Sequence, residues 1–467
     1  MFLNLFTIFA HKRLHFLTMK NYFLLIFAIL TIVACSKDDD GDRYAGPEPN
    51  WRNLPERPHD TFERTVLVYI SGENNLSHYI PSEIQELRQG SKGIGNNALV
   101  VYVDEANERR NPYILWIRDG VTVDSTALDN DPLSSSTETM LRVLNFTSTY
   151  YPANEYGLVL WGHASGWMIE DSAEGNTAGS RPFRAYGIDN GNNSSSTIGK
   201  WMNISTMAQT LNSWRHHLKF IFADCCQFQC IETAYELLGL ADYVIASPAE
   251  IPGKGAPYDT ITPGFFEQST TFYKTIVDRY FDQIIEWNSD WEGTYSSRTP
   301  LSVVYCPELL NLATATNEVL STFLPLENNA LPSLSDLIYY RGNTRKRMED
   351  VMYDMNDFIR KYTIGKTKST AADSSAYNKW RETFDRTIIY STNATEGWST
   401  SGQVSTTVFS YLSQPNRYGG ISMFVPQNRT NTWYLPYTLY GVDYNGYNED
   451  IKTTAWYAAA HLDEFGW

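Results

Sequence analysis

The sequence predicts an α/β protein built on a mostly parallel sheet with helices on both faces. Six short apolar runs have the length and composition of buried strands: Val66–Ile70, Leu99–Val103, Tyr113–Ile117, Gly157–Trp161, Phe220–Ala223 and Tyr243–Ala246. Helical patterns separate several of these runs, near residues 82–89, 137–150, 203–214 and 230–240. Alternation of this kind indicates parallel pairing, with Tyr113–Ile117 as the candidate for an antiparallel strand.

Residues 268–467 are expected to form a C-terminal α/β accessory region, packed on a catalytic domain at 61–267. Its candidate strands are Leu301–Val304, Thr387–Tyr390 and Gly420–Val425. Its candidate helices are residues 308–322, 346–361 and 404–413. No separate catalytic motif occurs there, so we expect this region to complete a substrate groove.

The N-terminus has the pattern of a lipoprotein signal. Lys20 precedes an apolar stretch that is too short to span a membrane, and this stretch ends in Ile32-Val33-Ala34-Cys35. We therefore assign residues 1–34 to a signal peptide, with Met19 as an alternative start, and expect Cys35 to be lipidated. The alternative is an ordinary signal anchor.

The segment 35–60 is predicted to be an acidic, Pro-rich tether. Its acidic run, residues 36–42, resembles the export signal of Bacteroidetes surface lipoproteins, although acidic runs are usually only solvated tethers. We expect an outer-membrane lipoprotein exposed at the cell surface. The net charge of −16, without a basic run, argues against nucleic-acid binding. Five clustered cysteines do not form a disulfide framework.

Cys226 and His163 are the candidate catalytic residues. Each follows an apolar strand, and the ends of neighbouring parallel strands meet at one edge of the sheet. His163 is then placed to act as base and acid towards Cys226. We expect a helix from about Gln227, whose dipole would lower the pKa of the thiol. Alternatively, the cysteine is an inert core residue and the histidine only bonds to backbone.

The segments around these residues resemble the clostripain-like cysteine peptidases, which belong to the same clan as caspases and gingipains. The resemblance rests on GLVLWGHASGW at 157–167 and on FADCCQFQCIETAYEL from Phe222. Weaker similarity in TVLVYISGENNL (65–76) and ADYVIASPAEIPGKGAPY (241–258) extends it to roughly residues 60–467. The resemblance implies a caspase-like fold and places Cys226, rather than Cys225, at the nucleophile position.

The same resemblance implies roles for residues around the dyad. Asp224 lines the pocket for a basic side chain, although a strand-end aspartate also commonly caps a helix. Ala164 replaces the family's glycine, whose N–H helps to stabilise the oxyanion. Glu250 borders the pocket. Lys254 stands where members that prefer arginine often carry an acidic residue, and its charge opposes basic substrates.

The long polar segment 168–202 contains Arg181 and Arg184. In the family this region often carries an activation cleavage after a basic residue, and the alternative is a variable surface loop. No cofactor is expected to be required. Calcium dependence occurs in some relatives, but no clear acidic loop supports a calcium site here. A metal site at the clustered cysteines is disfavoured, because adjacent cysteines rarely both reach one ion.

These observations together predict a surface lipoprotein that is a cysteine endopeptidase. The expected mechanism is peptide-bond hydrolysis by a Cys226/His163 dyad, with Arg or Lys before the cleaved bond. Its partners would be peptide or protein substrates, and the membrane through the lipid at Cys35. The alternative is an inactive surface lipoprotein of the same fold that binds host protein or glycan.

Overall fold

The computed structural model describes residues 51–55, 59–168, 185–189, 191, 199–289, 293–340, 352–395, 411–427 and 444–467. The chain divides into two compact units, Met1–Pro49 and Asn50–Trp467, and all described residues belong to the second. Cys35, Arg181 and Arg184 therefore lie outside the described residues.

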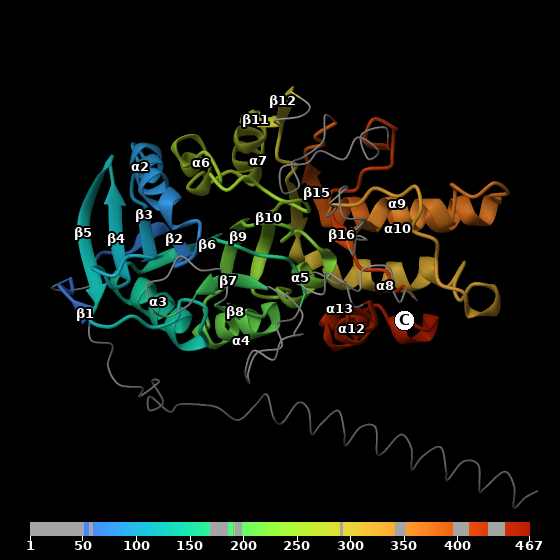
Figure 1. Cartoon of the computed structure of the whole chain (residues 1–467), viewed down its shortest axis with the longest axis horizontal. Helices are drawn as coiled ribbons and strands as arrows, with labels where there is room; N and C mark the ends of the chain where they lie inside the picture. The colour runs from blue at the N-terminus through green and yellow to red at the C-terminus, as the bar shows by residue number, and fades with distance from the viewer. Residues whose placement is uncertain are drawn as a thin grey trace, which may run out of the picture. The chain divides into compact units, whose positions relative to one another are not determined.

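A ten-stranded sheet forms the centre of this unit, in the order β1-β5-β4-β3-β2-β6-β9-β10-β13-β15 (Figure 1). Five central strands pair in parallel: β3 (Ala98–Glu105), β2 (Phe62–Gly72), β6 (Ala153–Trp161), β9 (Leu218–Asp224) and β10 (Ala241–Ala246). The strands at both edges run antiparallel: β1 (Trp51–Arg52), β5 (Val121–Leu128), β4 (Tyr113–Arg118), β13 (Ser302–Tyr305) and β15 (Ile388–Ser391).

Helices cover both faces of the sheet because its central strands are apolar on both sides. On β2, Val66 and Val68 belong to one buried cluster, and Leu67 and Tyr69 belong to the other. The first face is covered by α2 (Ile80–Gly90), α6 (Tyr258–Phe265) and α7 (Tyr273–Asp282). The second is covered by α3 (Thr137–Tyr150), α4 (Ile204–Trp214), α5 (Ile231–Glu236), α8 (Leu309–Leu320), α9 (Met355–Tyr362), α10 (Ala371–Thr387) and α13 (Ala455–Ala459).

Smaller elements complete the described part of the chain. Three two-stranded sheets pair β7 (Tyr186–Asp189) with β8 (Lys200–Met202), β11 (Ile285–Ser289) with β12 (Gly293–Ser297), and β14 (Tyr353–Asp354) with β16 (Ser422–Met423). The remaining α-helix of the described residues is α12 (Tyr444–Asp450), and short 3-10 helices occur in several of the connections. None of the described helices combines the length and the apolar composition that a membrane span requires.

The predicted α/β architecture is confirmed, including the antiparallel strand at Tyr113–Arg118. The region after residue 267 contributes β13 and β15 to the same ten-stranded sheet. The strands of this one sheet therefore come from both sides of the domain boundary that we expected between residues 267 and 268. The longest described helix, α10, was not anticipated. Part of the helix expected at 346–361 is α9, whereas residues 341–351 and 396–410 lie outside the described residues.

Candidate active site

The strand register brings His163 and Cys226 to the same edge of the sheet. β6 and β9 are adjacent parallel strands in which Trp161 pairs with Asp224. His163 and Cys226 each follow two residues later, beyond the carboxyl end of their strand. Because neighbouring strands lie about 4.8 Å apart, these two residues leave the sheet side by side. Both side chains are partly buried.

The backbone around His163 holds the imidazole in a defined place. Gly162 has a φ of 145°, and a Cβ at this position would lie 2.8 Å from the Ser71 carbonyl oxygen, so only glycine fits. The His163 carbonyl accepts a hydrogen bond from the Gly187 N–H of β7 at 2.8 Å. On the imidazole, Nε2 lies 2.6 Å from the Asn75 Oδ1. Since an amide oxygen only accepts, Nε2 carries the proton, and in the neutral imidazole Nδ1 has the lone pair.

Cys226 lies in an irregular turn and not at a helix N-terminus. Gln227 has a φ of 56°, and its N–H donates to the Ala249 carbonyl, so the chain continues beside β10 before α5 begins at Ile231. The helix expected from about Gln227 is therefore wrong, and the helix dipole is removed as a cause of thiol activation. The Cys226 sulfur instead accepts a hydrogen bond from the Ile251 N–H at 3.5 Å, and its thiol donates to the Ile251 carbonyl oxygen at 3.8 Å.

The remaining described cysteines are all free and fully buried: Cys225, Cys230 and Cys306. Burial raises the pKa of all three thiols, to about 12 for Cys230 and Cys306. A protonated, buried thiol is unreactive. Cys226 alone among the described cysteines is accessible to a substrate.

Ala164 lies next to the histidine in a bridge with Tyr186. The hydrogen bonds of this bridge use the His163 carbonyl and the Ser165 N–H, so the Ala164 N–H takes no part in it. Ala164 does not have a positive φ, so its backbone conformation is ordinary for an alanine. The exchange of glycine for alanine at this position therefore introduces no backbone strain.

Asp224 is placed behind the site and is 2 % exposed. Its carboxylate accepts hydrogen bonds from the Ala256 N–H at 2.8 Å, from the Tyr258 hydroxyl at 2.9 Å and from the Tyr280 hydroxyl at 3.0 Å. Burial raises its pKa to about 6 although these bonds lower it. In this structure Asp224 therefore fixes the turn after β10, and its role in lining a substrate pocket stays a prediction.

Glu250 and Lys254 lie in the same turn. Glu250 is partly buried beside Ile251, which contacts the Cys226 sulfur. Lys254 is exposed, and its Nζ lies 3.4 Å from the Glu86 Oε1. The other oxygen of Glu86 accepts the Tyr258 N–H at 3.1 Å. The opposing charge of Lys254 is thus balanced by a carboxylate of α2.

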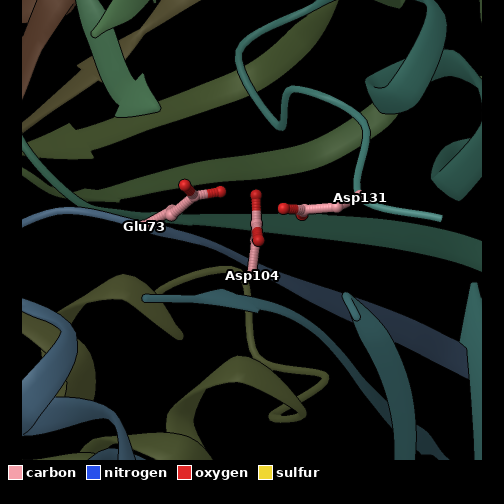
Figure 2. Close-up of side chains that lie close together, drawn as sticks. All are labelled: Glu73, Asp104 and Asp131. Atoms are coloured by element: carbon pink, nitrogen blue, oxygen red, sulfur yellow. The ribbon is translucent and has the colours of Figure 1, made fainter. Parts of the chain in front are cut away.

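Three further carboxylates meet beside β2 and β3, and the sequence analysis did not anticipate them. One oxygen from each of Glu73, Asp104 and Asp131 lies within 4.8 Å of the other two. Figure 2 shows the Asp104 carboxylate between those of Glu73 and Asp131. Burial raises the pKa of Asp104 and of Asp131, and the charge of Asp189 raises both further. This group has only oxygen ligands to offer a metal ion.

Comparison with known proteins places these residues in a family. A model of the clostripain family, peptidase family C11, matches residues 68–467. No curated protein sequence matched the chain.

Two of the solved structures that resemble this chain are also C11 proteases. A secreted C11 cysteine protease from Bacteroides thetaiotaomicron, in complex with an irreversible peptide inhibitor, is 25% identical, with a TM-score of 0.63 over 86% of this chain and 99% of that one. An inactive zymogen C11 protease from Parabacteroides distasonis is 24% identical over the same shares, with a TM-score of 0.59, and supports the fold.

Proposed function

Because the chain belongs to the clostripain family of cysteine peptidases, we propose that it hydrolyses peptide bonds with Cys226 as nucleophile and His163 as acid and base. The observation that carries this proposal is the pairing of Trp161 with Asp224, which sets the two residues side by side at the carboxyl edge of β6 and β9. The Asn75 contact supports the role of His163, because it leaves the lone pair of the imidazole on Nδ1.

The reaction follows from these positions. His163 Nδ1 takes the proton of the Cys226 thiol, and the sulfur attacks the carbonyl carbon of the scissile bond. The protonated imidazole then gives its proton to the leaving amine, and a thioester remains on Cys226. Water, deprotonated by Nδ1, hydrolyses the thioester and restores the thiol. The N–H groups of Ala164 and Cys226 are the proposed donors to the oxyanion.

A preference for Arg or Lys before the cleaved bond is the second part of the proposal. Asp224 and Glu86 place negative charge behind the turn that contacts Cys226, and Lys254 offsets part of it. Glu83 is also buried there, but its pKa is raised to about 9, mainly by burial, so it is neutral at pH 7. The net field of the ionised groups is negative and favours a cationic side chain. Since Asp224 is enclosed, its attraction acts over a distance and not through a direct hydrogen bond.

The expected location is the outer membrane, with the protein anchored by a lipid on Cys35 and exposed at the cell surface. Support for this part comes from the signal pattern that ends in Ile32-Val33-Ala34-Cys35 and from the acidic run after it. Metabolic labelling with an alkyne fatty acid, compared between the wild-type chain and Cys35→Ser, tests the anchor. Protease shaving of intact cells tests the exposure.

Hydrolysis of fluorogenic peptides by the full chain in detergent tests the chemistry. We expect cleavage after Arg or Lys, and a loss of at least about 10³-fold in kcat/KM for Cys226→Ala and for His163→Ala. Cys225→Ala is the matched control, because the neighbouring thiol is buried and should be dispensable. Cleavage only after uncharged residues would overturn the specificity. If Cys226→Ala retained activity, or no peptide were cleaved, the catalytic assignment would fail, and binding without catalysis would be favoured.

A further inference from the structure

A buried apolar cluster joins the loops of His163 and Cys226 to the C-terminal region of the chain. Trp167 lies four residues after the histidine, and Cys230 lies four residues after the candidate nucleophile; both are buried members of this cluster. Most of its other members come from residues 338–451. The C-terminal region therefore packs directly against both loops, so contacts that hold it in place also bear on the distance between His163 and Cys226.

The two loops touch at Gly166, which has a φ of 67°. A Cβ at this position would lie 2.8 Å from the Gln227 carbonyl oxygen and 2.9 Å from the Cys230 Sγ, so only glycine fits. The loop after β6 therefore lies in contact with the turn after β9. The Cys230 thiol is also hydrogen-bonded to the Trp167 backbone. The separation of the two loops thus depends on whatever holds Gly166 and Trp167 in place.

A side chain of helix α5 holds the segment of β16 beside these loops. This segment runs along the residues before α5: the Ser422 N–H donates to the Gln229 carbonyl at 3.1 Å, and Ser422 forms a parallel bridge with Cys230. Because α5 begins at the next residue, this strand-like pairing ends there. The Phe424 N–H donates instead to the Glu232 Oε1, at 2.7 Å. The Glu232 carboxyl group thus takes the place of a strand carbonyl.

Phe424 connects this hydrogen bond to the loop of the histidine. Its ring packs against the Trp167 ring, with the centroids 5.1 Å apart and the planes at 59°. The Tyr447 ring encloses the pair, 6.1 Å from the Trp167 ring and 6.3 Å from the Phe424 ring. Glu232 itself is 0 % exposed, so its bond is shielded from competing water. A continuous set of contacts therefore runs from Glu232 through Phe424 to Trp167.

We propose that Glu232 is a positioning residue for the proposed reaction, acting through Phe424 and Trp167. By fixing Trp167, it keeps the His163 imidazole at the working distance from the Cys226 sulfur. A displacement of about 1 Å in such a site can lower the rate by about 100-fold. The effect on catalysis rests on the proposed function of the dyad, whereas the link from Glu232 to the loop of Trp167 stands on the contacts alone.

Helix α5 offers a matched control one turn later. The Glu236 Oε1 accepts the Ala455 N–H at 2.7 Å, so Glu236 makes the same kind of bond to the C-terminal region as Glu232 does. This bond leads to helix α13, which begins at Ala455, and not to the aromatic pair. Glu236→Ala therefore removes an equivalent bond and leaves the contact between Phe424 and Trp167 in place.

Peptide hydrolysis by the full chain in detergent measures the effect, at a temperature where circular dichroism shows every variant folded. Glu232→Ala should lower kcat by at least about tenfold and change KM by less than about threefold, because the dyad is displaced while the substrate contacts remain. Glu232→Gln keeps an oxygen for the Phe424 N–H and should stay within about threefold of wild type in kcat. Glu236→Ala should stay within about twofold. Equal losses in Glu232→Ala and Glu236→Ala, or no rescue by glutamine, would overturn the assignment.

Phe424→Leu tests the second step of the link. It keeps the N–H that Glu232 accepts but removes the aromatic contact with Trp167, so it should lower kcat about as much as Glu232→Ala does. Because both variants break the same link, the double variant should lose much less than the product of the two single losses. Independent losses in the double variant, or a normal kcat in Phe424→Leu, would overturn the route. Phe424→Leu also decides the question if Glu232→Ala does not fold.

Amide hydrogen exchange, followed by mass spectrometry, tests the link without peptide hydrolysis. Peptic fragments that contain residues 163–168 should exchange at least about fivefold faster in Glu232→Ala and in Phe424→Leu than in wild type, because the loop opens more often. Glu236→Ala should leave this exchange unchanged. Exchange that is the same in all four proteins would overturn the link. If the wild-type chain cleaves no peptide, the proposed function fails, and the exchange measurement still decides whether Glu232 holds the loop.

Discussion

Replacing Asp224 by Asn tests whether this buried carboxylate is a structural support that is unfavourable in its charged form. An asparagine keeps the shape and can form a hydrogen bond with each of the three partners. Its oxygen accepts from the Ala256 N–H and the Tyr258 hydroxyl, and its amide donates to the Tyr280 hydroxyl, which can turn to accept. Asp224→Ala instead leaves three buried donors without an acceptor.

The magnitude follows from the pKa of Asp224, which burial raises from 3.8 to about 6. A shift of about 2.2 units at 1.36 kcal/mol per unit corresponds to about 3 kcal/mol. As the pH rises, the Asp224 carboxyl ionises at a lower pH in the unfolded chain than in the folded chain. The protonated carboxyl therefore contributes its full stabilisation below about pH 4, and this stabilisation is lost as the pH rises to about 6. Asp224→Asn should thus be more stable than wild type by about 1–3 kcal/mol at pH 8, and no more stable below pH 4. Asp224→Ala should be less stable than Asp224→Asn by about 3 kcal/mol, since each orphaned donor costs about 1 kcal/mol or more.

Urea unfolding of the three proteins between pH 4 and pH 8 measures these differences. The difference between wild type and Asp224→Asn is the decisive quantity, because other buried carboxylates titrate in the same direction and cancel in it. A difference that does not change with pH, or an Asp224→Asn protein that is less stable than wild type at pH 8, would refute the assigned role. On the same proteins, a fall of more than about 100-fold in cleavage after Arg would indicate direct contact with the substrate.

Four further outcomes are expected. Gly162→Ala should lower the free energy of unfolding by about 1–3 kcal/mol and reduce kcat/KM, because its φ of 145° is strained for alanine; thermal melts and peptide assays measure both. Ala164→Gly should leave kcat/KM within about threefold and cost about 0.5–1 kcal/mol of stability, so a large gain in activity would contradict the ordinary backbone assigned to it. Burial raises the pKa of Glu232 from 4.5 to about 7, so this group should cost the wild-type chain about 3 kcal/mol of stability as the pH rises from 4.5 to 7. Glu232→Gln should abolish this loss, and urea unfolding across that pH range measures it. Iodoacetamide should label Cys226 rapidly and Cys225 only after unfolding, as mass spectrometry of tryptic peptides would show; early labelling of Cys225 would contradict its burial.

Much of the central sheet was predictable because its strands are buried on both faces and are therefore continuously apolar. The strand β5, which lies next to the short edge strand β1, was missed, since its exposed positions make Val121–Leu128 look polar. The helix α10 was missed although its signals were present. Thr370 and Asp373 form a capping box, and buried aromatics recur at Tyr377, Trp380 and Phe384.

The placement of His163 and Cys226 at one edge of the sheet was predictable, because strand ends meet wherever two parallel strands are neighbours. The start of α5 at Ile231 was not predictable, since a positive φ at Gln227 and a hydrogen bond from its N–H to the Ala249 carbonyl interrupt the helical pattern. Asn75 is 88 residues from His163, and no sequence spacing reveals such a contact. The acidic group did leave a signal, because Glu73 and Asp104 come from the carboxyl ends of two adjacent strands.

The pairing of β6 with β9 also determines what a break in the chain between residues 168 and 185 would do. His163 would belong to one fragment and Cys226 to the other, so neither fragment alone would contain both residues of the proposed dyad. The two fragments would remain interlocked as neighbouring strands of one sheet, and β7 would stay bonded to the His163 segment. A molecule cleaved in this segment would therefore remain one particle and keep its activity when it is diluted. Its two fragments would separate only in denaturant.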